Sequence, residues 1–294
     1  MTSSIDAEGF LPPGSVLGQR YRLDRPIGAG SMGAVYAARD LAQDRPVALK
    51  IISGGHTSDP TMVARFQREG RIVSELRHPN IVDVFDVGQI DGEWVMTMEL
   101  LDGMNLSDAI ETRKAYEPEE AIQVLRGVLD ALEIAHRHQI VHRDIKPQNI
   151  FLAKNGGAMP SVKVLDFGVA KVVGLNAEEQ LTRSGTILGT PEFMSPEQAT
   201  GKGADHRSDL YAVACVAYAM LCGRPPFVDN WPMRIVMKQA FEAAAPPSRL
   251  RPDLAHTPGI DRFMARALEK KPEDRYQSAS EMRAALDALA GAPS

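Results

Sequence analysis

The chain has 294 residues, 44% hydrophobic and 24% charged, which supplies enough apolar material for one large domain or two modest ones and excludes general disorder. Its formal net charge of −5 offers no basic surface for nucleic acid or an anionic membrane, so any phosphate binding must be local. The N-terminus lacks the basic and apolar regions of a signal peptide, and the longest apolar run, residues 210–222, is too short to cross a bilayer.

The two cysteines also argue against a disulfide scaffold. Cys215 and Cys222 stand seven residues apart in the long apolar run, about two helical turns, which is too far for a bond between them. No neighbouring Cys/His cluster suggests a metal site. We expect two buried thiols in a reducing cytoplasm.

The first third of the chain has the pattern of a β-sheet. Residues 1–18, with Pro-Pro-Gly at 12–14, indicate a flexible lead-in. Asp59 and Pro60 are predicted to be the N-cap and first residue of a helix that runs to about residue 76. Around this helix we expect a five-stranded antiparallel sheet, with strands at residues 21–27, 34–40, 45–52, 81–89 and 94–98.

A glycine motif joins the first two predicted strands. Residues 28–35 read G-x-G-x-x-G-x-V. Such glycines can open a dinucleotide-binding unit, but that unit needs a helix directly after them and an acidic residue about 20 positions on. Here Lys50 stands at roughly that distance, so a loop that covers phosphates is favoured. The absence of G-x-x-x-x-G-K-[ST] leaves a P-loop NTPase unsupported.

Helical periodicity replaces strand patterning after residues 102–103. Ser278 and Glu281 have the spacing of a capping box for the last helix. The predicted helices lie at about residues 118–138, 208–222, 233–243, 259–268 and 279–288.

Two polar motifs lie within this helical part. Residues 142–149 read H-R-D-I-K-P-Q-N and residues 166–168 read D-F-G, downstream of V-A-L-K at 47–50. In this order, and with the glycine motif, they resemble the catalytic elements of protein kinases, most of all the bacterial eukaryotic-like (Hanks-type) serine/threonine protein kinases. The resemblance runs from about residue 21 to about residue 289.

The resemblance implies an α+β, two-lobed protein kinase fold. The kinase domain would span residues 19–290, after the flexible lead-in of residues 1–18. Its small β lobe, with one main helix, would take about residues 19–99, and its larger, mainly helical lobe about residues 103–290.

The implied activity is ATP-dependent phosphorylation of Ser or Thr hydroxyls on proteins in bacterial signalling. Asp144 would accept the proton of the attacking hydroxyl. Lys146 would contact the transferring phosphate, and Thr190 would hydrogen-bond both of these residues. This lysine and threonine favour a Ser/Thr protein substrate.

The same resemblance places the metal and the phosphates of ATP. Asn149 and Asp166 would bind Mg²⁺ or Mn²⁺. Lys50 would orient the α- and β-phosphates while paired with Glu69, and Glu75 on the same predicted helix is the less favoured partner.

Further residues would form the nucleotide site. They comprise the glycine loop, apolar walls for adenine, and the segment joining the lobes, whose backbone would bond the adenine edge. These residues are Ile27, Gly28, Ala29, Gly30, Ser31, Met32, Gly33, Val35, Ala48, Met98, Glu99, Leu101 and Leu152.

Other residues have structural roles in the resemblance. His142 is expected to be a buried residue near Phe167 and not a general base. Glu197 is expected to form a buried ion pair with Arg275, and Asp209 to brace the backbone of the catalytic loop.

Regulation and partners are also implied. Thr182, Ser184 and Thr186 stand where relatives are phosphorylated, and phosphate there could pair with Arg143 and order the loop through autophosphorylation. We expect protein substrates, a homodimer through the small lobe, a cytoplasmic location, no nucleic acid and no membrane span. The alternatives are a nucleotide-binding pseudokinase scaffold, or an ATPase or small-molecule kinase on the same fold.

Overall fold

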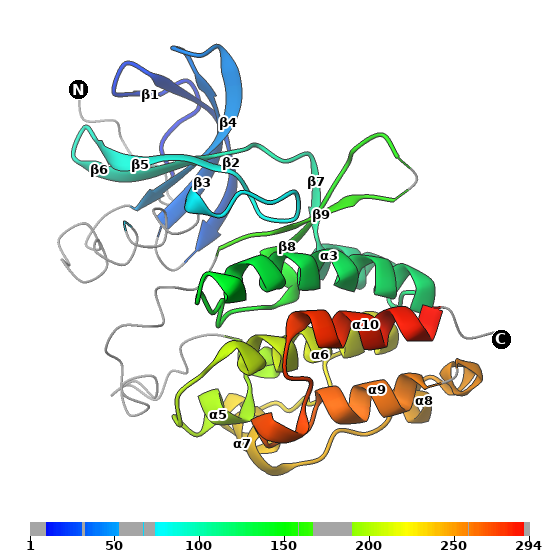
Figure 1. Cartoon of the computed structure of the whole chain (residues 1–294). Helices are drawn as coiled ribbons and strands as arrows, with labels where there is room; N and C mark the ends of the chain where they lie inside the picture. The colour runs from blue at the N-terminus through cyan, green and yellow to red at the C-terminus, as the bar shows by residue number, and fades with distance from the viewer. Residues whose placement is uncertain are drawn as a thin grey trace. The chain divides into compact units, whose positions relative to one another are not determined.

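A computed structural model describes residues 10–30, 33–52, 67, 74–157, 159–166, 190–257 and 259–290. The chain divides into two compact units (Figure 1). The small unit takes residues 1–78 and 82–102, and the large unit takes residues 79–81 and 103–294.

The small unit is built on one antiparallel sheet of six strands, in the order β1-β2-β3-β4-β6-β5. The sixth strand was not predicted. It is β1, whose two residues are too few to show an alternating pattern. The strands are β1 (Val16–Leu17), β2 (Tyr21–Gly30), β3 (Gly33–Asp40), β4 (Arg45–Ile52), β5 (Val84–Ile90) and β6 (Glu93–Met98).

The end of the predicted flexible lead-in is therefore folded onto the small unit. Leu17 pairs with Tyr21 and is buried, and Phe10 packs against the hydrophobic core. The Leu11 N–H donates to the Tyr36 hydroxyl at 2.8 Å. Residues 10–18, expected to be part of a flexible lead-in, instead contact the small unit, because apolar residues there extend the core of the sheet.

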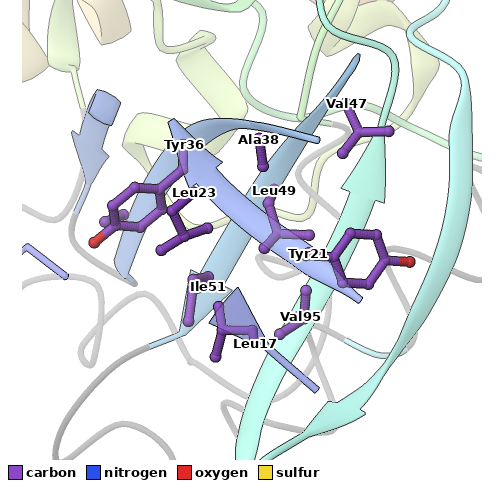
Figure 2. Close-up of a cluster of buried hydrophobic side chains, with 10 residues drawn as sticks. Leu17, Tyr21, Leu23, Tyr36, Ala38, Val47, Leu49, Ile51 and Val95 are labelled. Atoms are coloured by element: carbon purple, nitrogen blue, oxygen red, sulfur yellow. The ribbon is translucent and has the colours of Figure 1, made fainter. Parts of the chain in front are cut away.

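Alternation along the strands gives the sheet two different faces. Residues 34, 36 and 38 of β3 and residues 47, 49 and 51 of β4 point to one face, as the two-residue period of a strand requires. With Leu17, Tyr21, Leu23 and Val95 they form a cluster of buried side chains (Figure 2). The residues between them lie on the opposite face, which carries part of the candidate site.

The remaining predictions for the small unit are met in part. β5 begins at Val84 and not at residue 81, because Ile81 forms a parallel bridge with Val164 of the large unit. Of the predicted helix, Gln67, Ser74 and Glu75 are helical in the structure. Its predicted N-cap at Asp59 lies outside the described residues.

The large unit is mainly helical and also contains a three-stranded sheet that the sequence pattern does not reveal, since its strands have three or four residues. The strands are β7 (Gly103–Asn105), β8 (Ile150–Ala153) and β9 (Ser161–Val164). The α-helices are α2 (Leu106–Arg113), α3 (Pro118–Arg137), α5 (Pro196–Ala199), α6 (His206–Cys222), α7 (Pro232–Phe241), α8 (Pro247–Leu250), α9 (Ile260–Ala267) and α10 (Ala279–Ala290). Short 3-10 helices are η2 (Pro147–Asn149), η4 (Pro191–Phe193), η5 (Pro252–His256) and η6 (Pro272–Asp274).

Helix α6 is the centre of the large unit. Asp205 caps its first turn by accepting the Arg207 N–H, and every residue from 208 to 221 is buried. α3 packs against both α6 and α10 (Figure 1). Cys215 and Cys222 are both free thiols; Cys215 is buried, as expected, whereas Cys222 is only partly buried. Within the described ranges, no helix has the length and hydropathy needed to cross a membrane.

The cap of α10 differs in detail from the predicted capping box. The Ser278 hydroxyl accepts the Glu281 N–H at 3.0 Å, as expected. The Glu281 carboxylate, however, accepts the N–H of Gln277 at 2.6 Å, and Arg266 holds its other oxygen. The cap is therefore shifted by one residue on the carboxylate side.

Candidate active site

Two of the predicted catalytic residues of the large unit, Asp144 and Lys146, lie in the loop between α3 and η2. The Lys146 ammonium lies 2.8 Å from Asp144 Oδ2. Asn149 Nδ2 donates to the same carboxylate oxygen at 3.1 Å and to the Asp144 carbonyl at 2.9 Å. The sequence thus brings a carboxylate, an ammonium and an amide together within six residues. The Asp144 side chain keeps 21% of its surface exposed, so solvent can reach this carboxylate.

The predicted metal ligands come from two segments that are hydrogen-bonded to each other. The Leu165 N–H donates to the Asn149 carbonyl at 2.8 Å. Asp166 directly follows Leu165 in the chain, so this bond holds the two predicted ligands on neighbouring segments. Asp166 is exposed and has a positive φ of 44°. The amide nitrogen of Asn149 serves Asp144, so its oxygen is the atom suited to a cation.

His142 connects the two segments as a neutral side chain. It is fully buried, and burial lowers its pKa against the opposing effect of Asp209. Because the Asp144 N–H can only donate, His142 Nδ1 must accept that bond, which measures 3.2 Å. The ring proton is then on Nε2, which donates to the Leu165 carbonyl at 2.9 Å. His142 is structural, as predicted; Phe167, its predicted neighbour, lies outside the described residues.

Asp209, in the first turn of α6, fixes the backbone of the loop. It accepts the N–H of His142 at 2.8 Å and the N–H of Arg143 at 2.7 Å. His136 Nε2 of α3 lies 2.8 Å from the same carboxylate. The predicted bracing role of Asp209 is confirmed by these bonds. The bond to Arg143 stabilises an unfavourable backbone conformation, because the φ of 63° at Arg143 is uncommon for a residue other than glycine.

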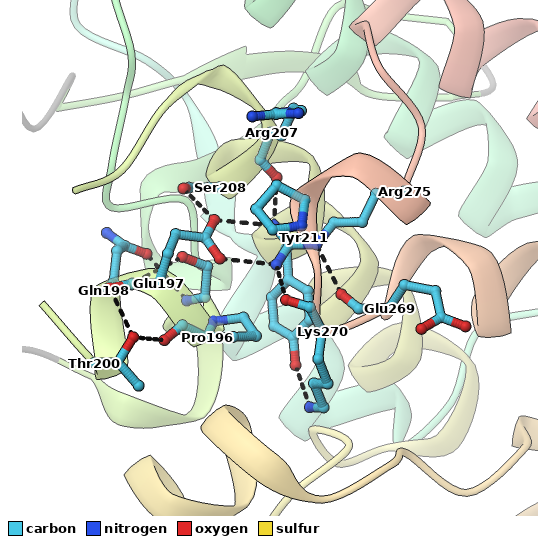
Figure 3. A network of polar contacts seen from close by, with 12 residues as sticks. Pro196, Glu197, Gln198, Thr200, Arg207, Ser208, Tyr211, Glu269, Lys270 and Arg275 are labelled. Carbon is cyan, nitrogen blue, oxygen red and sulfur yellow. Dashed lines mark hydrogen bonds and ion pairs between the residues drawn. The ribbon is translucent and has the colours of Figure 1, made fainter. Parts of the chain in front are cut away.

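The predicted ion pair between Glu197 and Arg275 is also confirmed (Figure 3). Two nearly parallel bonds of 2.9 and 2.7 Å join the guanidinium to the carboxylate, and both side chains are buried. Ser208 adds a 2.5 Å hydroxyl bond. Burial alone would raise the pKa of Glu197, but the bonds from Arg275 and Ser208 outweigh it and hold the pKa below its usual value.

Three further bonds complete the surroundings of Arg275. Its guanidinium donates to the backbone carbonyls of Glu269, Arg207 and Lys270 at 2.7, 3.2 and 2.9 Å. With the two bonds to Glu197, every N–H of the guanidinium has an acceptor. This is the condition under which a buried arginine is tolerated.

Thr190 does not make the predicted side-chain bonds. Within the described residues, its hydroxyl bonds neither Asp144 nor Lys146; these two contact each other directly. The Thr190 carbonyl accepts the Phe193 N–H at 3.4 Å and starts the η4 turn. The predicted bonds from the Thr190 hydroxyl are therefore not made in this structure, in which the Lys146 ammonium contacts the Asp144 carboxylate directly.

Two glutamines near this site were not predicted. Gln198 forms a capping box with Ser195 on α5 and donates Nε2 to the Arg143 carbonyl at 3.0 Å. Gln239 of α7 is buried, accepts the Tyr211 hydroxyl at 2.7 Å and donates to the Glu192 carbonyl at 2.6 Å. The S-x-x-Q spacing could have revealed the cap. Bonds to distant backbone carbonyls leave no sequence signal.

The small unit gathers several predicted nucleotide residues on one sheet face. Val35 pairs with Lys50, and Ala48 pairs with Met98. Directly paired residues share a face, and positions two apart along a strand share it too, so these four side chains lie on the face opposite the buried cluster. The register thus brings the predicted lysine and three predicted apolar walls together.

The glycine motif is only partly described. Gly33 has a φ of 146°, and a Cβ there would lie 1.9 Å from the Ile51 carbonyl oxygen, so the close approach of β3 to β4 requires glycine. Gly28, Ala29 and Gly30 pair with β3. The remaining predicted loop residues, Ser31 and Met32, lie outside the described residues.

Other predicted positions are placed separately. Ile27, on β2, is 41% exposed, and Leu152, on β8 of the large unit, is buried. The Glu99 N–H donates to the Asp83 carbonyl and its carboxylate accepts the Asp83 N–H, both at 2.9 Å, which fixes the chain just before Leu101. The predicted partner of Lys50 and the predicted phosphorylation sites lie outside the described residues: Glu69, Thr182, Ser184 and Thr186.

A small unit built on an antiparallel sheet, a mainly helical unit and a catalytic loop braced from α6 are features of the protein kinase fold. The protein kinase domain model matches residues 21–286, so the chain belongs to this family. Its relatives include the serine/threonine-protein kinase PknB of Mycolicibacterium smegmatis, 39% identical over 274 residues, which cover 92% of this chain and 43% of the relative. The serine/threonine-protein kinase pkn3 of Myxococcus xanthus is 40% identical over 278 residues, covering 94% and 51%.

Solved structures agree with this assignment. The PknI kinase domain of Mycobacterium tuberculosis superposes with a TM-score of 0.74 at 28% identity, covering 96% of this chain and 100% of that domain. This chain spans about half the length of the two full-length relatives above. The similarity is therefore to bacterial serine/threonine kinases, over their kinase domains.

Proposed function

We propose that this chain transfers the γ-phosphoryl group of ATP to Ser or Thr hydroxyls of proteins, with Asp144 as the proton acceptor. The observation that carries the proposal is the arrangement around Asp144. Its carboxylate is oriented by Lys146 at 2.8 Å and Asn149 at 3.1 Å, and part of its surface stays exposed. A hydroxyl could therefore reach an oriented proton acceptor, which is what this reaction requires.

Lys146 has a second use in this proposal. Its ammonium lies 2.8 Å from Asp144 Oδ2, and its positive charge would also oppose negative charge on the transferring phosphoryl group. Lys50 would serve the α- and β-phosphates from the small unit, next to the apolar face formed by Val35, Ala48 and Met98.

Mg²⁺ or Mn²⁺ would be held by Asn149 and Asp166. The donor types fit: one amide oxygen and one exposed carboxylate suit a hard cation that completes its shell with water and phosphate oxygens. No group of three His, Cys, Asp or Glu side chains that could hold a metal alone occurs in the described part of the chain. When bound, the ion would neutralise charge on the phosphates.

The test is a comparison of Asp144→Asn with wild type. This change keeps the shape of the side chain but removes its basicity, so we expect the turnover number to fall about a hundredfold or more. Asp253→Asn, which alters an exposed carboxylate on η5, is the matched control and should keep wild-type turnover. Unchanged turnover in Asp144→Asn would exclude Asp144 as the proton acceptor.

The same assay separates the pseudokinase alternative. A scaffold would bind ATP without transferring phosphate in either the wild type or the variants. Phosphoryl transfer by the wild-type protein would exclude the scaffold alternative. Loss of this transfer on chelation of Mg²⁺ would support the proposed metal requirement.

Autophosphorylation of Thr182, Ser184 or Thr186 is part of the proposal, with Arg143 as the group that would receive the phosphate. Mass spectrometry of active protein should find phosphate on one of them; complete absence of phosphate from fully active protein would contradict this. We also propose a homodimer through the small unit, testable by light scattering, and a cytoplasmic location, testable by cell fractionation.

A further inference from the structure

The side chain of Gln198 uses both ends of its amide. On one side, Oε1 accepts the N–H of Ser195 at 3.0 Å and completes the capping box of α5. On the other side, Nε2 donates to the carbonyl oxygen of Arg143 at 3.0 Å, 55 residues away in the sequence. Gln198 lies next to Glu197, whose ion pair anchors the same helix (Figure 3). An anchored helix is thus bonded to the catalytic loop.

The carbonyl that receives this bond belongs to the peptide group between Arg143 and Asp144. The N–H of that peptide group donates to His142 Nδ1 at 3.2 Å. Its two polar atoms are therefore held from opposite edges, by Gln198 and by His142. Because the peptide group is planar, holding both edges fixes its plane and, with it, the position of the Asp144 Cα from which the side chain departs.

The backbone at Arg143 needs this support. Its φ of 63° lies in the left-handed region, which costs a residue with a Cβ of order 1 kcal/mol or more. Asp209 holds the peptide group before Arg143 through a 2.7 Å bond to its N–H. Gln198 holds the peptide group after it. The uncommon conformation is thus bonded on both sides.

We infer that Gln198 is a positioning residue for Asp144, a role that rests on the proposed function. The position requires an acceptor toward Ser195 and a donor toward Arg143, and an amide supplies both. A carboxylate can serve only the first bond. A methionine of similar length can serve neither. Through Gln198, the orientation of the Asp144 carboxylate depends on the position of α5 relative to the catalytic loop.

Gln198→Glu is the informative variant. The carboxylate keeps the acceptor for the Ser195 N–H, and glutamate is a standard third residue of a capping box, so α5 should stay capped. It places an oxygen against the Arg143 carbonyl, where the Nε2 donor was. We expect kcat to fall about tenfold, because the proton acceptor would be less well oriented toward the attacking hydroxyl, with KM for ATP within about twofold of wild type.

Gln89→Glu is the matched control. Gln89 also donates Nε2 to a backbone carbonyl, that of Gly92 at 3.0 Å, but at an exposed hairpin of the small unit. This variant should keep wild-type kcat. The two glutamate variants carry the same charge change, so a difference between them reports the position and not the charge.

The experiment measures kcat and KM for ATP and for a Ser/Thr peptide, with the folded fraction determined by thermal denaturation. A lowered kcat per folded molecule with unchanged KM values supports the inference. A wild-type kcat in Gln198→Glu, a loss explained by unfolding, or a raised peptide KM alone would overturn it. Absence of transfer by wild-type protein itself would instead refute the proposed function, and the positioning role with it.

Discussion

At the scale of single residues, the site depends on buried side chains whose donors and acceptors each have a defined hydrogen-bond partner. His142 has one tautomer because its two ring nitrogens face a backbone donor and a backbone acceptor. Arg275 has an acceptor for each N–H. Such residues contribute rigidity, and their energetic effects are measurable separately from catalysis.

His142 predicts a pH dependence of stability. Burial lowers its pKa in the folded state, whereas an unfolded histidine titrates near about 6.5. Below that pH the unfolded chain binds a proton at His142 that the folded chain does not bind. The contribution of His142 to the free energy of unfolding is therefore fully present above about pH 6.5 and is lost as the pH falls.

The size of this effect is at most about 1.4 kcal/mol per pH unit. Urea unfolding of wild type and His142→Gln between about pH 7.5 and pH 5.5 should show a flatter dependence in the variant. Parallel curves for the two proteins would mean that His142 does not titrate as its burial implies.

Arg275 predicts a large loss on removal of one partner. Arg275→Met would leave the Glu197 carboxylate buried and without its cation, which we expect to cost about 3–5 kcal/mol of unfolding free energy. The double variant Glu197→Leu with Arg275→Met removes both charges and should lose less. Denaturant titration of both proteins checks this; a double variant less stable than the single one would contradict the assignment of the cost to an unpaired charge.

At the scale of elements, α6 organises the large unit and ends at a glycine. Gly223 has a φ of 72°, and a Cβ there would lie 2.2 Å from the Lys114 carbonyl oxygen. Helices commonly end in this left-handed conformation, where glycine avoids the steric cost. Here the end of α6 also packs against the chain just after α2, so two separate effects demand glycine.

Gly203 allows these effects to be separated. It has a similar φ of 83°, but a Cβ there would meet nothing within 4 Å. Gly203→Ala should therefore cost only the backbone strain, about 1 kcal/mol, and Gly223→Ala clearly more. Thermal unfolding of the two variants measures the difference. Equal losses would show that the approach of Lys114 adds no cost.

Elements with strong periodicity could be predicted from the sequence, and short ones could not. The strands at residues 34–40 and 45–52 and the helix beginning at residue 118 agree closely with β3, β4 and α3. β1 and the strands of the three-stranded sheet have two to four residues, and no periodic pattern can appear over such a length.

The candidate site shows the same limit. The pair of Glu197 with Arg275 follows from the resemblance to kinases, whereas the contact of Asp144 with Asn149 was not predicted, since the motif gives these two residues separate roles. The bond from Gln198 to Arg143 could not be predicted, because its acceptor is a backbone carbonyl that every residue type provides.

At the scale of the whole molecule, the proposed function assigns a separate task to each of the two units. The small unit aligns Lys50 with an apolar sheet face, and the large unit orients Asp144 within a braced loop. Membership of the protein kinase family explains these separate tasks, since kinases bind the nucleotide and position the attacking hydroxyl of the substrate with different elements.

The most direct test of this account is phosphosite mapping after incubation of the purified chain with γ-labelled ATP, Mg²⁺ and a generic basic protein. The account predicts label on Ser or Thr hydroxyls of the chain or of the added protein. Release of labelled inorganic phosphate without labelled protein would instead indicate an ATPase. Nucleotide binding with no transfer at all would contradict the central claim and favour a scaffold.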